Sequence, residues 1–265
     1  MSELPSGPQS GSTGTVATAQ PSAVGAVPTR AVIVERYRSS RPTTWGLTTP
    51  GVQERLATTQ NVVALTFDAC GGPTPRSAGC GYDRDLIELL RRHQAKATLF
   101  LNQRWIAANP GPSHELMADP LFEIGNHGTR HLPLSVTGRS AYGVRGTADP
   151  GEVYDEIVGN RDTLTALTGH MPRWFRPGTA FCDDVAVRIA ADLDCRIAGF
   201  SVNGDAGTTF TPAQVVAALA TAKAGDIIIS HLNRPEHQTA EGYRDALPRL
   251  LDRGLRTVTL SDVPS

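Results

Sequence analysis

Apolar runs alternate with amphipathic segments from residue 61 to the end of the chain. Runs with the length and composition of β-strands cover 61–67, 97–102, 121–125, 172–175, 196–202, 226–230 and 256–260. Helical spacing of apolar residues lies between most of them, over 83–93, 151–169, 211–225 and 246–254. Strands that alternate with helices predict a parallel sheet with both faces covered. The fold class is therefore α/β, and a doubly wound sheet and a closed barrel both fit the pattern.

Composition divides the chain into three parts. Residues 1–30 are rich in Ser, Gly, Pro, Thr and Ala, which predicts a disordered leader or linker because little apolar surface is available for burial. Residues 31–60, which contain "AVIVERY" and Trp45, are expected to pack on the main domain as an extension. Residues 61–265 form that domain.

Charge and hydropathy exclude two classes of partner. The 25 basic and 26 acidic residues provide no basic field for nucleic acid, and no apolar run approaches the ~20 residues of a membrane span. The first residues, "MSELPSGPQS", lack a secretion-signal pattern, so we expect either a cytoplasmic protein or one whose signal was removed. The four cysteines match no zinc-ribbon spacing, and whether they form disulfides stays open.

Ionisable or polar residues follow five of the seven predicted strands. In strand order they are Asp68, then His127 and His131, then Arg176, then Asn203 and Asp205, and finally His231. Because the carboxyl ends of parallel strands meet on one face of a barrel, these side chains are expected to share a pocket.

The predicted set has the parts of a metal-assisted hydrolase. Two imidazoles four residues apart, His127 and His131, suit Zn²⁺ or a similar divalent ion. Asp68 is placed to take a proton from attacking water, and His231 to protonate the leaving group. Arg176 would keep Asp68 ionised, and Asp205 would orient His231. These roles indicate hydrolysis of an amide or ester.

The motifs resemble those of the NodB-type polysaccharide deacetylases over residues 60–260. "TFDAC", "HGTRH" and "IISH" resemble the first, second and fifth motifs of that family, "FRPGTA" resembles the third in part, and "SVNGDAG" resembles the fourth poorly. The resemblance implies a distorted (β/α) barrel of about seven parallel strands that removes acetyl groups from N-acetylated sugars. It also implies that Asp68 is the base, His231 the acid, His127 and His131 metal ligands, and Arg176 the brace of the base.

Ala69 departs from the family pattern, which has a metal-binding aspartate at that position. A replacement ligand would account for this difference, with Asp83 as our choice and Cys70 as the second nearby donor. Asp83 could instead cap a helix, and a disulfide from Cys70 to Cys80 would remove its thiolate. Two histidines completed by water would also account for the alanine, and so would a metal-free and inactive site.

The expected function is hydrolysis of acetamide groups on an envelope glycan, either peptidoglycan or a chitin-like polymer. Zn²⁺ is the expected ion, with Co²⁺, Ni²⁺ and Mn²⁺ as alternatives, and Asn203 and Asn233 are expected to bind sugar hydroxyls. Hydrolysis of a small non-sugar amide and a non-catalytic glycan-binding module are the alternative functions. An extracellular or envelope location is expected, with a cytoplasmic one as the alternative.

Overall fold

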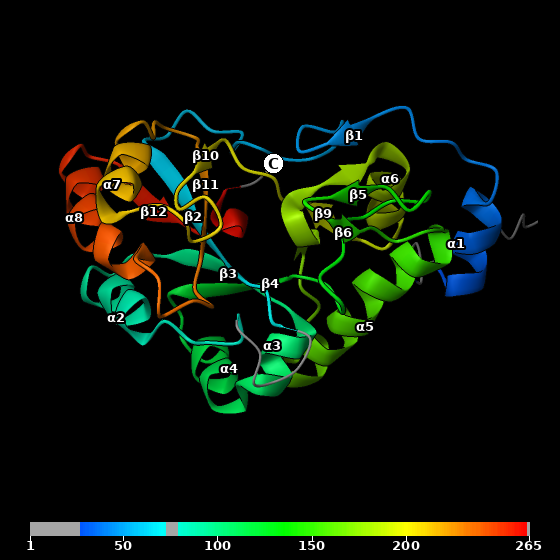
Figure 1. Cartoon of the computed structure of the whole chain (residues 1–265), viewed down its shortest axis with the longest axis horizontal. Coiled ribbons are helices and arrows are strands. Elements are labelled where there is room, and N and C mark those ends of the chain that lie inside the picture. Colours follow the sequence, from blue (N-terminus) through cyan, green and yellow to red (C-terminus); the bar gives the residue numbers. More distant parts are fainter. Residues whose placement is uncertain (1–26, 73–78, 264–265) are drawn as a thin grey trace, which may run out of the picture.

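A curled parallel sheet forms the centre of the computed structural model, which describes residues 27–72 and 79–263 (Figure 1). Its order is β10-β11-β2-β3-β4-β7-β9, and β12 also pairs with β2. The strands are β2 (Val62–Ala69), β3 (Ala97–Leu101), β4 (Phe122–Asn126), β7 (Trp174–Phe175), β9 (Arg196–Ile197), β10 (Val202–Asn203), β11 (Ile227–His231) and β12 (Arg256–Val258). Every pairing between them is parallel, which confirms the α/β class and the predicted distorted barrel.

The predicted strand over 196–202 is two short strands rather than one. β9 and β10 are the two ends of the sheet, so the chain crosses the open seam of the barrel between them. The N-terminal extension lies at this seam, where Gln53 bridges to Ala198 and Arg55 bridges to Asp226. Residues 53–56 make the backbone hydrogen bonds here that neighbouring strands would make in a closed barrel.

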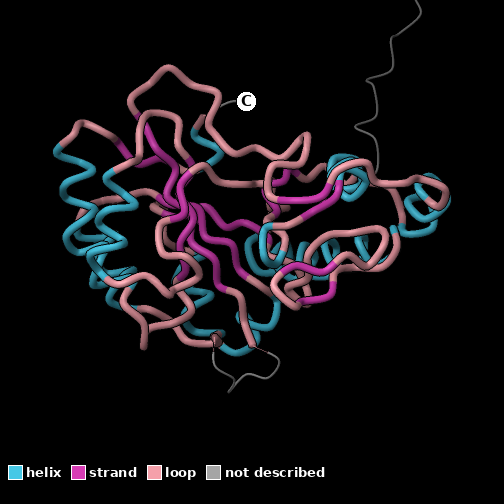
Figure 2. Tube along the Cα trace, turned by 45° about the horizontal axis from the view of Figure 1, so that its top comes forward, coloured by secondary structure: helices cyan, strands magenta, loops and turns pink. Residues whose placement is uncertain are grey.

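Helices lie around the sheet, with α1 packed against α5 and α6 and not on the sheet itself (Figures 1 and 2). They are α1 (Arg30–Tyr37), α2 (Arg84–Arg92), α3 (Gln103–Ala108), α4 (Pro110–Met117), α5 (Pro150–Thr168), α6 (Asp184–Asp192), α7 (Pro212–Ala220) and α8 (Thr239–Asp252). Their ends follow local rules: Thr211 forms a capping box for α7, and Gly169 ends α5 with a φ of 81°. α8 begins seven residues before the predicted segment and contains Pro248 in its interior.

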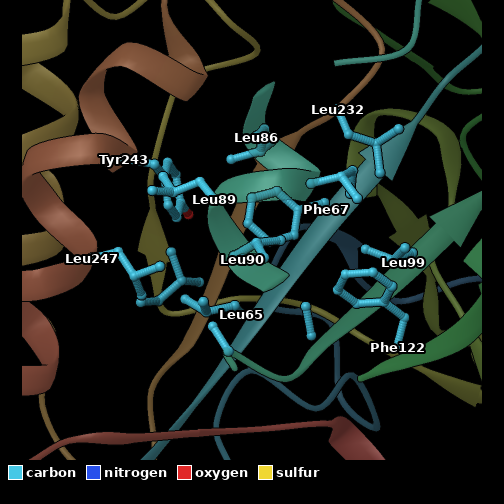
Figure 3. Packing of buried hydrophobic residues seen from close by; sticks show 14 of the residues in the cluster. Leu65, Phe67, Leu86, Leu89, Leu90, Leu99, Phe122, Leu232, Tyr243 and Leu247 are labelled. Atoms are coloured by element: carbon cyan, nitrogen blue, oxygen red, sulfur yellow. The ribbon is translucent and has the colours of Figure 1, made fainter. Parts of the chain in front are cut away.

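Strand β2 separates two apolar clusters by the alternation of its side chains. Val63, Leu65, Phe67 and Ala69 belong to an outer cluster with α2 and α8, where the Phe67 and Tyr243 ring centroids are 5.3 Å apart (Figure 3). Val62 and Ala64 belong to a second cluster with Phe100, Trp174 and Ile227. Because successive side chains point to opposite faces, Thr66 and Asp68 continue the face of this second, inner cluster.

The segment before the sheet packs on the far side of the molecule from α8. α1 lies against α5 and α6, where the Tyr37 hydroxyl donates to Asp192 at 2.8 Å. β1 (Trp45–Gly46) pairs with β8 (Cys182–Asp183), and β5 (Ser140–Ala141) pairs with β6 (Val144–Arg145).

Residues 1–26 of the predicted leader lie outside the described residues. No described helix has both the length and the apolar character needed to cross a bilayer.

Candidate active site

The carboxyl ends of the strands surround a cavity of about 400 Å³. Four of the residues predicted from the strand ends line it, namely Asp68, His131, Asn203 and His231, and Cys70 joins them. Leu47, Phe200 and Ile229 supply apolar surface beside this polar set. The register explains part of the arrangement, since His231 is the direct neighbour of Asp68 across β11 and β2.

Asp68 is held by a buried arginine. Arg176, with no exposed surface, donates from Nη1 to Asp68 Oδ1 and to Thr66 Oγ1, both at 2.8 Å. Its other nitrogens donate to the carbonyls of Ala198 and Gly199. These contacts hold the Asp68 carboxylate in place and leave Oδ2 on the side of His127, whose Nε2 is 3.6 Å away.

One ring nitrogen of His127 is hydrogen-bonded to the backbone, and the other faces Asp68 and Cys70. Nδ1 lies 2.8 Å from the carbonyl oxygen of Arg176, which can only accept, so Nδ1 carries the proton. In the neutral ring the lone pair is therefore on Nε2, which faces Asp68 and the Cys70 thiol, whose Sγ is 3.7 Å away. A second partner that orients the ring in this way is typical of metal-binding histidines.

A buried polar network shapes the loop from His127 to His131. Glu156, with no exposed surface, accepts from the backbone of Arg130 and Leu132 at 3.0 and 3.1 Å. Gly128 has a φ of 79°, and a Cβ there would lie 2.3 Å from Glu156 Oε1. The loop therefore brings the two imidazoles together, with ring centroids 4.7 Å apart.

Three donor atoms lie close together beside the cavity, which Cys70 and His131 line and behind which His127 is buried. The ligand atoms of Cys70, His127 and His131 all lie within 4.8 Å of one another. Cys70 is a free thiol, so it is not bridged to Cys80. Burial alone would raise the pKa of Cys70, but the imidazoles of His131, His127 and His231 lower this pKa well below its ordinary value. The site thus favours a thiolate beside two imidazoles.

His231 is oriented by a buried carboxylate. Its Nδ1 is 2.9 Å from Asp205 Oδ1, and its backbone N–H donates to Asp205 Oδ2 at 2.8 Å. Burial alone would lower the pKa of His231, but Asp205 and then Cys70 raise it well above its ordinary value. Nε2 of this imidazole is therefore a proton donor in the cavity.

Two predicted site residues have other positions. Asp83 is the N-cap of α2, where its side chain accepts from Leu86 N at 3.0 Å, and the group of convergent donors does not include it. Burial raises the pKa of Asp83 to about 6. Asn233 is buried outside the cavity lining, and its Nδ2 donates to Gly79 O at 2.7 Å. The carboxylate of Asp83 is thus a helix cap, and Cys70 is the donor beside the histidines.

Three residues of the site and its surroundings were not predicted from the sequence. Glu156 and Asn160 occupy one buried face of α5, and Asn160 Nδ2 donates to Asn126 Oδ1 at 2.8 Å. Two polar residues four apart on an apolar helical face were the available clue. Tyr142, which also lines the cavity, lies in a segment without strand or helix periodicity.

Comparisons with known proteins give a family match and related sequences. A family model described as polysaccharide deacetylase matches residues 55–198. The peptidoglycan-N-acetylglucosamine deacetylase of Bacillus cereus is 25% identical over 208 residues, which cover 77% of this chain and 88% of that protein.

Solved structures show the same fold. The Bc1960 peptidoglycan N-acetylglucosamine deacetylase superimposes with a TM-score of 0.67 at 21% identity, covering 80% of this chain and 92% of that one. A CE4 family pseudoenzyme from Bacillus anthracis superimposes with a TM-score of 0.65 at 23% identity, covering 79% and 67%. The fold, the order of the motifs and the family match lead to one assignment: this chain belongs to the polysaccharide deacetylase family.

Proposed function

We propose that the protein is a metal-dependent deacetylase that hydrolyses acetamide groups on an envelope glycan, either peptidoglycan or a chitin-like polymer, outside the cytoplasm. The observation that carries the proposal is the single cavity that contains a braced carboxylate, a carboxylate-oriented imidazole and a cluster of metal-ligating atoms. The family assignment supports deacetylation as the reaction.

Cys70, His127 and His131 would hold the ion. Cys70 Sγ lies 3.7 Å from His127 Nε2, and the ligand atoms of all three residues lie within 4.8 Å of one another, so this donor set suits one thiophilic divalent ion. Thiolate and imidazole donors favour Zn²⁺ over Mn²⁺, which prefers oxygen. The bound ion would polarise the acetamide carbonyl and acidify water.

The chain's own residues would move the protons. Asp68, held in place by Arg176, takes a proton from water through Oδ2 as the water oxygen adds to the carbonyl carbon. His231, held by Asp205, donates its Nε2 proton to the sugar nitrogen as the carbon–nitrogen bond breaks. The products are the free amine and acetic acid, which loses its proton to the solvent as acetate. Asp68 then releases its proton to the solvent and His231 takes one up, which restores both side chains.

The first test measures acetate released from an N-acetylglucosamine tetramer and from peptidoglycan. Chelation should stop release and added Zn²⁺ should restore it. Asp68→Asn should lower turnover by a factor of about 10² or more, since proton transfer of this kind contributes that much. Asp155→Asn, an exposed carboxylate paired with Arg30, is the matched control and should retain full turnover. Full turnover by Asp68→Asn would end the proposal.

The second test identifies the ligand that replaces the missing carboxylate at Ala69. Protein loaded with Co²⁺ should show the near-ultraviolet absorption of a thiolate–cobalt bond. Cys70→Ala should lose this absorption and bind less metal, whereas Cys195→Ala, which removes a buried thiol elsewhere, should keep both. Unchanged absorption in Cys70→Ala would exclude Cys70 as a ligand.

A non-catalytic glycan-binding module is the second candidate, and Ala69 favours it. This residue is buried among apolar side chains of the outer cluster and has no atom that can bind a metal. Glycan binding without acetate release, at any added metal, would establish this second function in place of the first.

A further inference from the structure

An aromatic row leads away from the cavity. It consists of Trp45, Phe181 and Tyr142, with ring centroids 5.8 Å apart for Trp45 and Phe181 and 5.4 Å apart for Phe181 and Tyr142. Tyr142 lines the cavity together with Asp68 and His231. The row is therefore continuous with the site at which the acetamide would react.

Tyr142 is exposed in a backbone conformation that disfavours it. It is 78% exposed, the highest value among the large apolar side chains of the described residues. It and Gly143 form the two-residue turn between Ala141 and Val144, with φ of 50° and 77°. Such a turn needs two positive φ angles and favours Asn-Gly, so an aromatic residue at the first position is strained. The ring contacts Phe181, but most of its surface stays exposed, so this contact compensates the backbone strain only in part.

The hairpin that carries Tyr142 is fixed to the loop of the metal-ligating histidines. Thr147 donates from Oγ1 to Ser135 O at 2.6 Å and from its backbone N–H to Pro133 O at 3.1 Å. Gly146 N–H donates to Arg139 O at 3.0 Å, across the base of the hairpin. Pro133 is two residues beyond His131, so the ring of Tyr142 is held at a defined place relative to the reaction site.

We propose that the aromatic row, with Tyr142 as its exposed member, stacks against a sugar ring next to the acetamido sugar in the cavity. This inference rests on the proposed function, and it makes the substrate an oligomer or polymer rather than a single sugar. The faces of a pyranose carry C–H groups that pack on an aromatic ring, while the hydroxyls at its rim stay hydrated. Contact with a sugar explains why Tyr142 lies at the edge of the cavity although it lowers folding stability there.

The test separates binding from folding by three substitutions. Tyr142→Asn gives the turn its preferred sequence and removes the ring, so its Tm should equal or exceed that of the wild type. Tyr142→Phe keeps the ring. Met171→Ala removes another exposed apolar side chain, one that does not line this cavity, and is the control.

Calorimetric titration of the full chain with an N-acetylglucosamine tetramer, in the presence of a chelator that prevents turnover, gives the result. Tyr142→Asn should raise the Kd about threefold to tenfold, whereas Tyr142→Phe and Met171→Ala should bind as the wild type does. The Kd of the N-acetylglucosamine monomer should not change in Tyr142→Asn.

Several results would overturn the inference. They are an unchanged tetramer Kd in Tyr142→Asn, an equal loss for monomer and tetramer, a lowered Tm, and the absence of tetramer binding by the wild type. The acetate assay is read separately. If the wild type binds the tetramer through Tyr142 but releases no acetate, the stacking site stands and deacetylation falls.

Discussion

Replacement of Arg176 by methionine tests how much the buried ion pair between Arg176 and Asp68 contributes to the free energy of unfolding. Methionine keeps much of the length and the apolar stem of the side chain, and it removes the guanidinium. Four acceptors lose their donor: Asp68 Oδ1, Thr66 Oγ1 and the carbonyls of Ala198 and Gly199. The contact of Arg176 Cζ with the Phe100 ring, 4.3 Å from its centroid, is also lost.

The expected loss is about 3–5 kcal/mol of unfolding free energy. Removing one partner of a buried ion pair costs this much because the other charge stays buried and uncompensated. Asp68 has 5% of its side chain exposed and Arg176 has none, so water cannot replace the guanidinium without rearrangement. A loss of this size is a large fraction of the ~5–15 kcal/mol that stabilises a typical protein.

Urea denaturation measures this loss. With m of about 2–3 kcal/mol/M, the midpoint of Arg176→Met should fall by about 1–2.5 M at unchanged m. The double variant with Asp68→Asn removes both charges, so its loss should be smaller than the sum of the single losses by about 1–3 kcal/mol.

An exposed ion pair provides the control. Arg188 lies 3.8 Å from Asp184 and is 56% exposed, so Arg188→Met should change stability by less than about 0.5 kcal/mol. The reasoning is wrong if Arg176→Met lowers the unfolding free energy no more than Arg188→Met does. It is also wrong if the losses from Arg176→Met and Asp68→Asn simply add, because the two side chains would then not stabilise each other.

Three further substitutions test the elements that support the site, each by its change in unfolding free energy. Gly128→Ala should cost about 1–3 kcal/mol and lower metal affinity, because the φ is 79° and the new Cβ meets Glu156. Gly111→Ala, which has open space at an ordinary φ, should be neutral or stabilising, and an equal loss would contradict the steric argument. Thr211→Ala should cost about 1 kcal/mol through the lost capping box of α7, and an unchanged midpoint would refute this. Leu99→Ala should cost about 2–5 kcal/mol, because this side chain is fully buried, and a loss below about 1 kcal/mol would show that the core collapses around the gap.

The spacing of apolar residues along the sequence predicted helices and strands whose formation depends on residues close together in the chain. β2 and β11 are continuous apolar runs because both of their faces are buried, and the pattern predicts each within two residues of its observed limits. Thr211 and Pro212 predict where α7 begins, but the helix ends at Ala220, short of the predicted limit at Gly225. Such features are readable because hydrogen bonds of a helix, and the alternation of a strand, connect residues that are close in sequence.

The sequence pattern also predicted that the ionisable side chains meet at the carboxyl ends of the strands. Parallel strands all point the same way, so residues at their carboxyl ends meet whatever the exact order of the strands. Asp68, His131 and His231 are therefore expected in one cavity from the sequence alone, and they line it.

Only the tertiary structure decided which donor stands beside the histidines and what occupies the edge of the cavity. Cys70 and Asp83 are both near Ala69 in sequence, but one side chain enters the cavity and the other caps α2. Tyr142 meets Phe181 across 39 residues of chain, through a turn with no periodicity of its own. These choices depend on backbone direction at single residues and on contacts between distant segments, which apolar and polar spacing does not encode.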